Sequence, residues 1–254
     1  ILEMLGIPYS GSGVLAQALT LVKSMKKEVL DFHKIPTPSF QLFKSQEQRL
    51  HPGLSFPLIV KPNAEGSSIG ITSKSVVMNK EDLRRQVNDV LTTYNQHALV
   101  EEFCPGREFT LALLGNPARV MPIVEITFDH LPEGMPKIDG YESKWVYDTP
   151  ENPSELKCPA EVPTKLKSRL ETIAKKTFDV LHCVDFARID IRLDKGGEPN
   201  ILDVNALPGL MPDPKSNSRF TKACYAAGMS YQEIISSILY SAFDRYNLHK
   251  KIIK

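Results

Sequence analysis

One segment, residues 186–205, constrains the fold of this chain more than any other. From Ala187 to Leu193 apolar and charged side chains alternate strictly, which is typical of a half-buried strand. A second alternating run ends at Asn205, with Leu202 and Val204 expected on its apolar side. The Lys-Gly-Gly-Glu sequence at residues 195–198 predicts a turn between the two runs. The segment therefore predicts an antiparallel hairpin with one apolar and one polar face.

The register of this hairpin decides which polar side chains face each other. The turn allows Leu193 to pair with Pro199 or with Asn200, and we favour the second pairing. This register sets Asp190 opposite Asp203, whereas a slip of one residue would carry Asp203 to the other face. Two carboxylates about 5 Å apart across a strand pair repel each other. A cation is therefore expected beside them.

The same register sets Arg188 opposite Asn205, so an amide joins the two carboxylates. This donor set suits a hard cation such as Mg²⁺, which binds few protein ligands and completes its octahedron with phosphate and water. The alternative is a solvated ladder of ion pairs between the arginines and the aspartates, and the hairpin taken alone favours that ladder. The rest of the chain favours the metal.

The composition excludes several classes of protein. The net charge of +1 gives no reason to expect binding to nucleic acid or to an anionic membrane. No apolar run approaches ~20 residues and no basic-then-apolar leader is present, so we expect neither a membrane span nor secretion. The four cysteines are far apart, which argues against a zinc site or a disulfide framework and favours the cytoplasm.

The 254 residues predict a mixed order of helices and strands, hence an α+β or α/β protein of two lobes. Helices are expected over residues 15–29, from residue 79 or 80, after Pro163 and from Ser230, where Glu233 completes a capping box. Strands are expected over residues 56–62, 71–77, 98–103, 108–114 and 118–126. Residues 127–163 and 206–220 are expected to be mostly irregular.

Two of these helices carry specific expectations about burial. The first helix presents the lysines at positions 23, 26 and 27, which are assigned to a solvated face. The last helix is expected to bury Ile234, Ile235, Ile238, Leu239 and Ala242.

Three loops carry residues that could bind a nucleotide. Lys61 leads into Glu65-Gly-Ser-Ser-Ile-Gly70, whose backbone amides could surround phosphate oxygens, although most such loops are simple turns. Residues 100–108 could run along a nucleotide, or form a plain connection with exposed acids. Glu142-Ser-Lys-Trp145 would act only if the long irregular segment closes over the site.

Taken together, these motifs resemble the D-alanine–D-alanine ligases of the ATP-grasp fold, and they occur in the same order. The matching motifs are Gly6-Ile-Pro-Tyr-Ser-Gly-Ser-Gly13, Lys61-Pro with Glu65-Gly-Ser-Ser-Ile-Gly70, Glu101-Glu-Phe with Gly106-Arg-Glu108, Glu142-Ser-Lys144, Ala187-Arg-Ile-Asp190, Asp203-Val-Asn205-Ala-Leu-Pro-Gly209 and Ala227-Gly-Met-Ser230. The resemblance covers essentially the whole chain. It implies an α+β ATP-grasp fold with a central ATP-binding lobe and a C-terminal lobe, each with an antiparallel or mixed sheet and helices.

The resemblance also implies roles for the matched residues. ATP would be contacted by Lys23, Lys61, Ser68, Glu101, Phe103, Cys104 and Glu108. Two Mg²⁺ ions, or Mn²⁺ in their place, would be bound by Asp190, Asp203 and Asn205. The catalytic residues would be Arg188, Ser67, Gly209 and Lys144, with Lys144 reaching the γ-phosphate. The amino acid substrates would be contacted by Ser218, Arg219 and Trp145.

The implied activity is ATP-dependent ligation of two amino acids through an acyl-phosphate, in the first place D-alanine to D-alanine with release of ADP. The alternatives are another amino or hydroxy acid pair, or a non-catalytic ATP-binding module. The expected partners are small-molecule substrates, without nucleic acid or membrane, and a homodimer is left open. Residues 1–35 are expected to end an N-terminal domain and connect it, 36–105 to form the central ATP-binding lobe, and 106–254 the C-terminal lobe with the metal and substrate sites.

Four departures from the family pattern bear on this expectation. The family's first domain would lie upstream of Ile1. Asp203 is one methylene shorter than the usual glutamate, and Trp145 replaces a frequent tyrosine. The segment 211–220, near the second amino acid, is longer than usual. The last three departures all concern positions that the resemblance assigns to metal or substrate.

Overall fold

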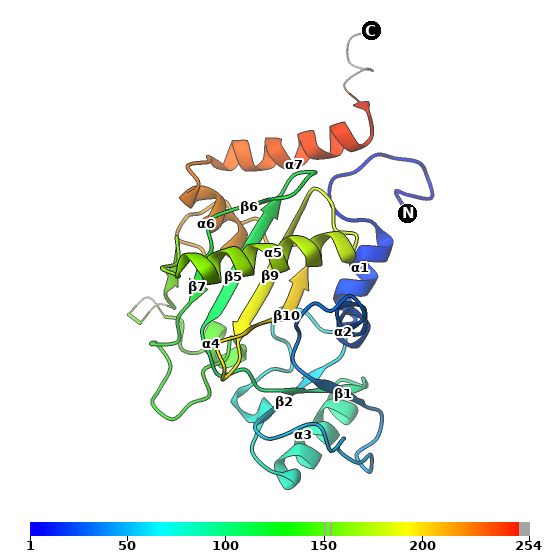
Figure 1. Ribbon diagram of the computed structural model, residues 1–254, viewed down its shortest axis with the longest axis vertical. Coiled ribbons are helices and arrows are strands. Elements are labelled where there is room, and N and C mark those ends of the chain that lie inside the picture. The colour runs from blue at the N-terminus through cyan, green and yellow to red at the C-terminus, as the bar shows by residue number, and fades with distance from the viewer. Residues whose placement is uncertain (150, 153, 249–254) are drawn as a thin grey trace.

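The computed structural model of the protein describes residues 1–149, 151–152 and 154–248. Its helices are α1 Val14–Leu21, α2 Lys23–Phe32, α3 Lys80–Thr93, α4 Tyr141–Trp145, α5 Thr164–Val180, α6 Arg219–Ala226 and α7 Tyr231–Arg245, with a 3-10 turn at Ser73–Ser75. Its strands are β1 Phe40–Phe43, β2 Leu58–Pro62, β3 Val76–Val77, β4 Ala98–Glu102, β5 Glu108–Leu114, β6 Arg119–Val120, β7 Val124–Ile126, β8 Leu156–Lys157, β9 Phe186–Leu193 and β10 Pro199–Asn205. The molecule is elongated, with the smaller of two antiparallel sheets towards one end and the larger in the middle (Figure 1). The α+β class expected from the sequence is confirmed.

The smaller sheet has the strand order β1-β4-β2-β3 and packs against helix α3. The N-cap residue Asn79 accepts hydrogen bonds from two backbone amides in the first turn of α3, which satisfies donors that the helix cannot pair itself. Val60 of β2 and Val100 of β4 belong to the core formed with α3. Since successive side chains of a strand point to opposite faces, Lys61 and Glu101 lie on the other face of this sheet.

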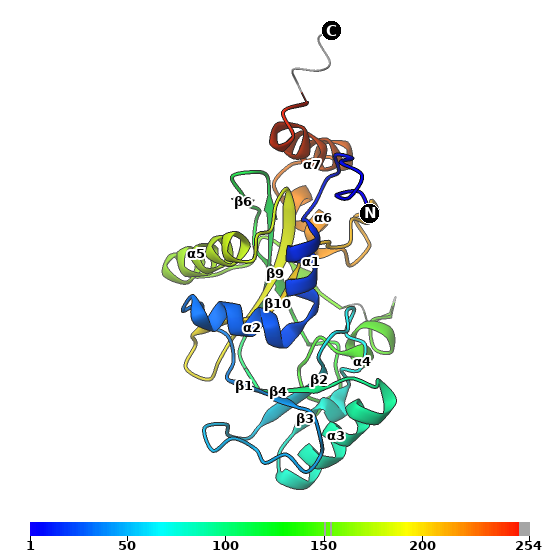
Figure 2. The same ribbon diagram turned by 90° about the vertical axis from the view of Figure 1, so that its right-hand side faces the viewer.

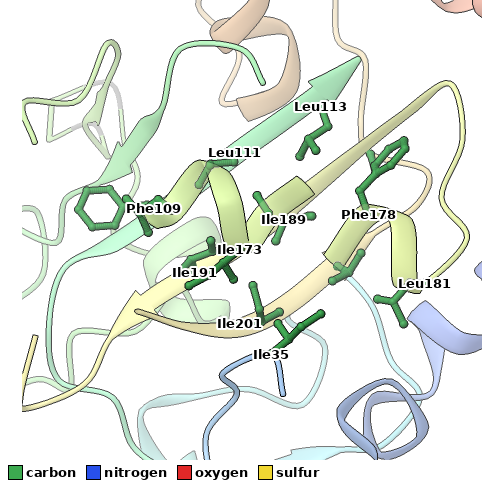
Figure 3. Close-up of a cluster of buried hydrophobic side chains, with 14 of the residues drawn as sticks. Ile35, Phe109, Leu111, Leu113, Ile173, Phe178, Leu181, Ile189, Ile191 and Ile201 are labelled. Atoms are coloured by element: carbon green, nitrogen blue, oxygen red, sulfur yellow. The ribbon is translucent and has the colours of Figure 1, made fainter. Parts of the chain in front are cut away.

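The larger sheet has the order β10-β9-β5-β7-β8, with β6 paired to β5. Helix α5 covers one face, and α6 with α7 covers the other (Figure 2). Strand β5 supplies both cores by alternation, because Leu111 and Leu113 pack towards α5 whereas Ala112 and Leu114 pack towards α6. Figure 3 shows the first core, in which apolar residues of α5 meet those of the strands: Phe109, Leu111, Leu113, Ile173, Phe178, Ile189 and Ile191.

The hairpin β9–β10 forms as predicted, with one change near the turn. The favoured pairing of Leu193 with Asn200 is wrong, because Leu193 pairs with Pro199 and a bulge between Ile201 and Asp203 then shifts the register by one residue. Beyond the bulge the predicted pairing is confirmed, with Asp190 opposite Asp203. The extra residue of the bulge is Leu202, so Ile201 and Val204 are buried whereas Leu202 is only half-buried. The expectation that Leu202 faces the core is therefore wrong, because a bulged residue leaves the alternation of the strand.

The predicted helix over residues 15–29 is in fact two helices. Val22 has an extended conformation with φ −83° and ψ 97°, which ends α1 and begins α2 at Lys23. The backbone amide of Lys23 donates to the carbonyl oxygen of Asn63 at 2.9 Å instead of bonding within a helix. The break turns α2 so that its lysines point into the molecule.

Other differences from the predicted elements are local. The strand expected over residues 118–126 is divided into β6 and β7, with Pro122, which cannot donate to a ladder, between them. Only Val76 and Val77 of the range 71–77 are extended in a strand. Helix α4 lies in a segment expected to be irregular, and α6 begins within the last two residues of the other such segment. On α7, Ile235 and Leu239 are exposed because Ile234, Ile238 and Ala242 form the buried stripe.

Within the described residues, we find no helix with the length and apolar character needed to cross a bilayer.

Candidate active site

Helix α2 carries three lysines that are buried rather than solvated. Lys23, Lys26 and Lys27 follow the i, i+3, i+4 spacing that places side chains on one helical face, and each is less than a tenth exposed. Lys23 donates to the carbonyl oxygen of Glu65 in the glycine–serine loop. Lys26 donates to Asp203 of β10. The assignment of this face to solvent is wrong, and the spacing was the signal in the sequence that could have corrected it.

Lys27 lies beside Glu101 and Lys61, and the three charged groups form one buried cluster. The Glu101 carboxylate is 3.1 Å from the Lys61 ammonium and 3.5 Å from that of Lys27. Burial raises the pKa of Glu101, but the two lysines lower it by more, so the carboxyl stays ionised. Burial lowers the pKa of Lys27 to about 8, although Glu101 opposes this shift. Within the described residues, the second oxygen of Glu101 has no hydrogen-bond partner.

The connection after β4 continues this cluster towards the larger sheet. Glu108 is buried and ion-paired with Arg192 at 3.1 Å. Burial raises the pKa of Glu108, and Arg192 opposes that shift. The guanidinium of Arg192 also stacks on the ring of Phe103 at 5.2 Å. Cys104 is buried, and burial raises the pKa of its thiol to about 11, so it is not a nucleophile at neutral pH.

The polar end of the hairpin holds two acids, each paired with a cation of the chain. The Asp190 carboxylate accepts two hydrogen bonds from Arg188, at 3.0 and 2.8 Å. It also accepts hydrogen bonds from Thr110 at 2.7 Å and from the Asn205 amide at 3.1 Å. Asp203 is paired with Lys26. The repulsion expected between the facing carboxylates is therefore offset by an arginine and a lysine.

Three of the hairpin side chains could bind a divalent cation. Asp190, Asp203 and Asn205 present carboxylate and amide oxygens, the donors that Mg²⁺ takes in proteins. Within the described residues, no group of three or more histidine, cysteine or acidic side chains has the arrangement of a metal site. The donor set thus suits a cation that shares its coordination with phosphate and water, rather than one held entirely by protein.

A second cluster joins the glycine–serine loop to helices α4 and α6. Lys144 of α4 is 2.9 Å from one oxygen of Asp139 and donates to the Ser68 hydroxyl at 2.7 Å. The other oxygen of Asp139 is 2.6 Å from Arg219 of α6. Burial raises the pKa of Asp139, but Arg219 and Lys144 lower it by more, to well below the usual range. Asp139 thus bridges two cations, and nothing in the sequence motifs pointed to it.

Local backbone features hold this cluster in place. Glu142 accepts hydrogen bonds from the backbone amide and the hydroxyl of Ser73, which fixes the start of α4 to the end of the loop. A Cβ added at Gly140 would lie 2.9 Å from the carbonyl oxygen of Ile71, so a side chain at this position would force the two segments apart. Ser67 and Ser68 both have positive φ, at 51° and 60°. This tight loop geometry brings Ser68, but not the exposed Ser67, against Lys144.

The remaining predicted residues lie at the edge of this region. Ser218 donates to the carbonyl oxygen of Gly209 at 2.8 Å. Arg219 is buried, and its Nε has no hydrogen-bond partner among the described residues. Trp145 is 67% exposed, and its expected contact with substrate stays a prediction. A cavity of about 580 Å³ reaches the hairpin, lined among others by Lys23, Glu65, Asp203, Asn205 and Leu207.

The comparisons with known proteins assign this arrangement to one family. The family model described as "D-ala D-ala ligase C-terminus" matches residues 21–240, most of the chain. The chain belongs to the D-alanine–D-alanine ligase family. The D-alanine–D-alanine ligase of Bordetella avium is 37% identical over 245 residues, which are 95% of this chain and 72% of that protein. Uncharacterized protein y4sG of Sinorhizobium fredii is 36% identical over 247 residues, 97% of this chain and 69% of that protein.

Solved structures of the family share the fold. The D-alanine–D-alanine ligase of Bacillus anthracis complexed with ATP has a TM-score of 0.75 and 25% identity, over 98% of this chain and 74% of that one. A second structure of the D-alanine–D-alanine ligase of Bacillus anthracis gives a TM-score of 0.76 over 98% of this chain and 75% of that one, again at 25% identity. The ATP-grasp fold and the ligase family expected from the motifs are thus confirmed.

Proposed function

We propose that this chain forms the ATP-binding and C-terminal lobes of an ATP-dependent ligase that joins D-alanine to D-alanine and releases ADP. The observation that carries this proposal is the convergence of buried lysines from α2 and β2 with the acidic end of the hairpin β9–β10. Such a concentration of cations suits a polyphosphate, and the acid–amide group beside it suits the metal that accompanies ATP. Membership of the ligase family supports the reaction.

In this proposal the nucleotide lies between the two sheets. Lys23, Lys61 and Ser68 contact the phosphates, and Lys27 joins them because it lies beside Lys61. The adenine and ribose are contacted by Glu101, Phe103, Cys104 and Glu108. We also propose lobe boundaries at residues 35 and 105. The boundary at 105 lies between the two sheets, because β4 of the smaller sheet ends at Glu102 and β5 of the larger sheet begins at Glu108.

The metal is proposed at Asp190, Asp203 and Asn205, with Mn²⁺ able to replace Mg²⁺. When bound, it neutralises charge on the phosphoryl group that is transferred. Arg188 and the backbone amide of Gly209 are placed to stabilise charge that develops on the reacting oxygens, which requires donors held in position beforehand. The two hydrogen bonds between Arg188 and Asp190 hold the arginine in this way.

The chemistry needs no nucleophile from the protein. The carboxylate of the first amino acid attacks the γ-phosphorus, and ADP leaves. The amine of the second amino acid then attacks the acyl carbon, loses a proton and expels inorganic phosphate. Lys144 is proposed to contact the γ-phosphate, and Ser67 is proposed to lie near the first amino acid. Ser218, Arg219 and Trp145 are proposed on the substrate side.

A second candidate is a ligase for another amino or hydroxy acid as acceptor. Arg219 fits an acceptor of either kind, because this buried guanidinium is held by Asp139 and its Nε has no hydrogen-bond partner among the described residues. An acceptor with a carboxylate suits an arginine that can still donate. The expected homodimer stays a prediction.

The two candidates are separated by ADP release from the full-length protein with ATP and Mg²⁺. The screen offers D-alanine, L-alanine, D-lactate together with D-alanine, and simple amines. We expect D-alanine alone to support turnover. Faster turnover when D-lactate is added would select the second candidate. ADP release that no amino acid stimulates would contradict both.

A further inference from the structure

Lys26 occupies an unusual place in the hairpin site. Its side chain is 0% exposed. Among the described residues, the Lys26 ammonium donates a hydrogen bond to one carboxylate oxygen of Asp203. Asp203 itself is 34% exposed on its side chain. The lysine therefore approaches the carboxylate from the protein side, and the open side of the carboxylate faces the cavity that Lys23 and Asn205 also line.

The charges at this end of the hairpin are already matched one to one. Asp190 is held by Arg188, and Asp203 by Lys26. Two divalent cations would add four positive charges to two carboxylates that carry two negative charges. ATP phosphates would supply further negative charge, but Lys23 and Lys61 lie there as well.

A metal ion cannot displace Lys26 from Asp203 without cost. The displaced ammonium would need another anion, since a buried charge without a partner is strongly unfavourable. The nearest acid of the neighbouring cluster, Glu101, is already shared by Lys27 and Lys61. Phosphate oxygens arriving from the cavity would add a partner to Lys26 and leave its ion pair in place.

We propose that the Lys26 ammonium takes the position of one of the two divalent cations, so that bound ATP brings a single metal ion to Asp190, Asn205 and the free oxygen of Asp203. The lysine supplies a fixed positive charge where the resemblance to the family implies a second Mg²⁺. This inference rests on the proposed nucleotide site, and it replaces the expectation of two ions by one.

The test counts metal ions without measuring activity. The full-length protein is saturated with the β,γ-imido analogue of ATP, and bound Mn²⁺ is counted by electron paramagnetic resonance together with bound nucleotide. The wild type should bind one Mn²⁺ per nucleotide. Lys26→Met, which frees Asp203, should bind two at the same free Mn²⁺ concentration. Lys176→Met is the control, because this lysine of α5 donates to the carbonyl oxygen of His33 and has no part in the proposed site, and it should keep one ion per bound nucleotide.

Each outcome bears on the inference. Two Mn²⁺ per nucleotide in the wild type would overturn it while leaving the nucleotide site intact, and this measurement needs no variant to fold. One ion in folded Lys26→Met would also overturn it, because Lys26 would then not be what excludes the second ion. If folded wild-type protein binds no nucleotide, the proposed function itself fails and the inference fails with it.

Discussion

Replacing Asp139 by asparagine should destabilise the protein out of proportion to the size of the change. The substitution keeps the shape of the side chain but removes the charge that bridges Arg219 and Lys144. Breaking a buried ion pair costs roughly 3–5 kcal/mol because the remaining partner is left as an uncompensated charge. Arg219 is only 9% exposed on its side chain, whereas Lys144 is 25% exposed and stays partly hydrated. We therefore expect the lower end, about 3 kcal/mol of unfolding free energy.

The assay is urea unfolding at pH 7, with the free energy taken from the midpoint and slope of the transition. Glu198→Gln is the matched control, because it removes a carboxylate from an ion pair with Arg169 in which both side chains are about half-exposed. That change should cost less than about 1 kcal/mol. If Asp139→Asn costs no more than Glu198→Gln, the buried bridge does not hold α4 and α6 together as argued.

The same bridge has a defined pH dependence. The pKa of Asp139 is lower in the folded protein than its usual value, so the carboxyl binds its proton more weakly when folded. The stability that it contributes is fully present above the unfolded pKa of about 3.9 and is lost as the pH falls below that value. Wild-type stability should therefore fall more steeply with acid than that of Asp139→Asn. Parallel curves would contradict this.

Three further changes test other parts of the structure. Asp203→Asn should lower the unfolding free energy by about 3 kcal/mol, because it leaves the buried Lys26 unpaired; a neutral effect in urea unfolding would mean that relief of acid repulsion dominates. Because the pKa of Lys27 is about 8, nucleotide affinity measured by calorimetry should fall from pH 7 to pH 9, and Lys27→Met should flatten that profile. Ser230→Ala should cost about 1 kcal/mol in urea unfolding by removing the cap of α7, and an unchanged midpoint would exclude that contribution.

The parts of the site that follow from local pattern were predictable from the sequence. The hairpin β9–β10 alternates over its first strand and has a glycine turn, so the hairpin and its polar face could be predicted, whereas the pairing of Asp190 with Asp203 also depends on the bulge. The bulge at Leu202 could not be derived, because either pairing of Leu193 satisfies the turn and only packing against the rest of the sheet selects a mixture of both.

The partners of the charged residues were not predictable, because they depend on tertiary structure. A lysine on a helix is solvated unless another element covers it, and only the break at Val22 directs Lys26 and Lys27 inwards. Asp139 follows no motif, and its partner Arg219 lies 80 residues further along the chain. Sequence reasoning identified the acids of the hairpin and Arg188 beside Asp190, whereas Lys26, which pairs with Asp203, lies on a helix far away in sequence.

The central claim is that ATP activates the carboxylate of one amino acid as an acyl-phosphate, which the amine of a second then attacks. It is tested by incubating the full-length protein with ATP, Mg²⁺ and D-alanine labelled with ¹⁸O in both carboxylate oxygens, and analysing the phosphate by ³¹P NMR. Each ligation should transfer one labelled oxygen from the carboxylate to phosphate, with the dipeptide forming in equal amount. Phosphate without label would mean that water attacks ATP directly, and would contradict the ligase assignment.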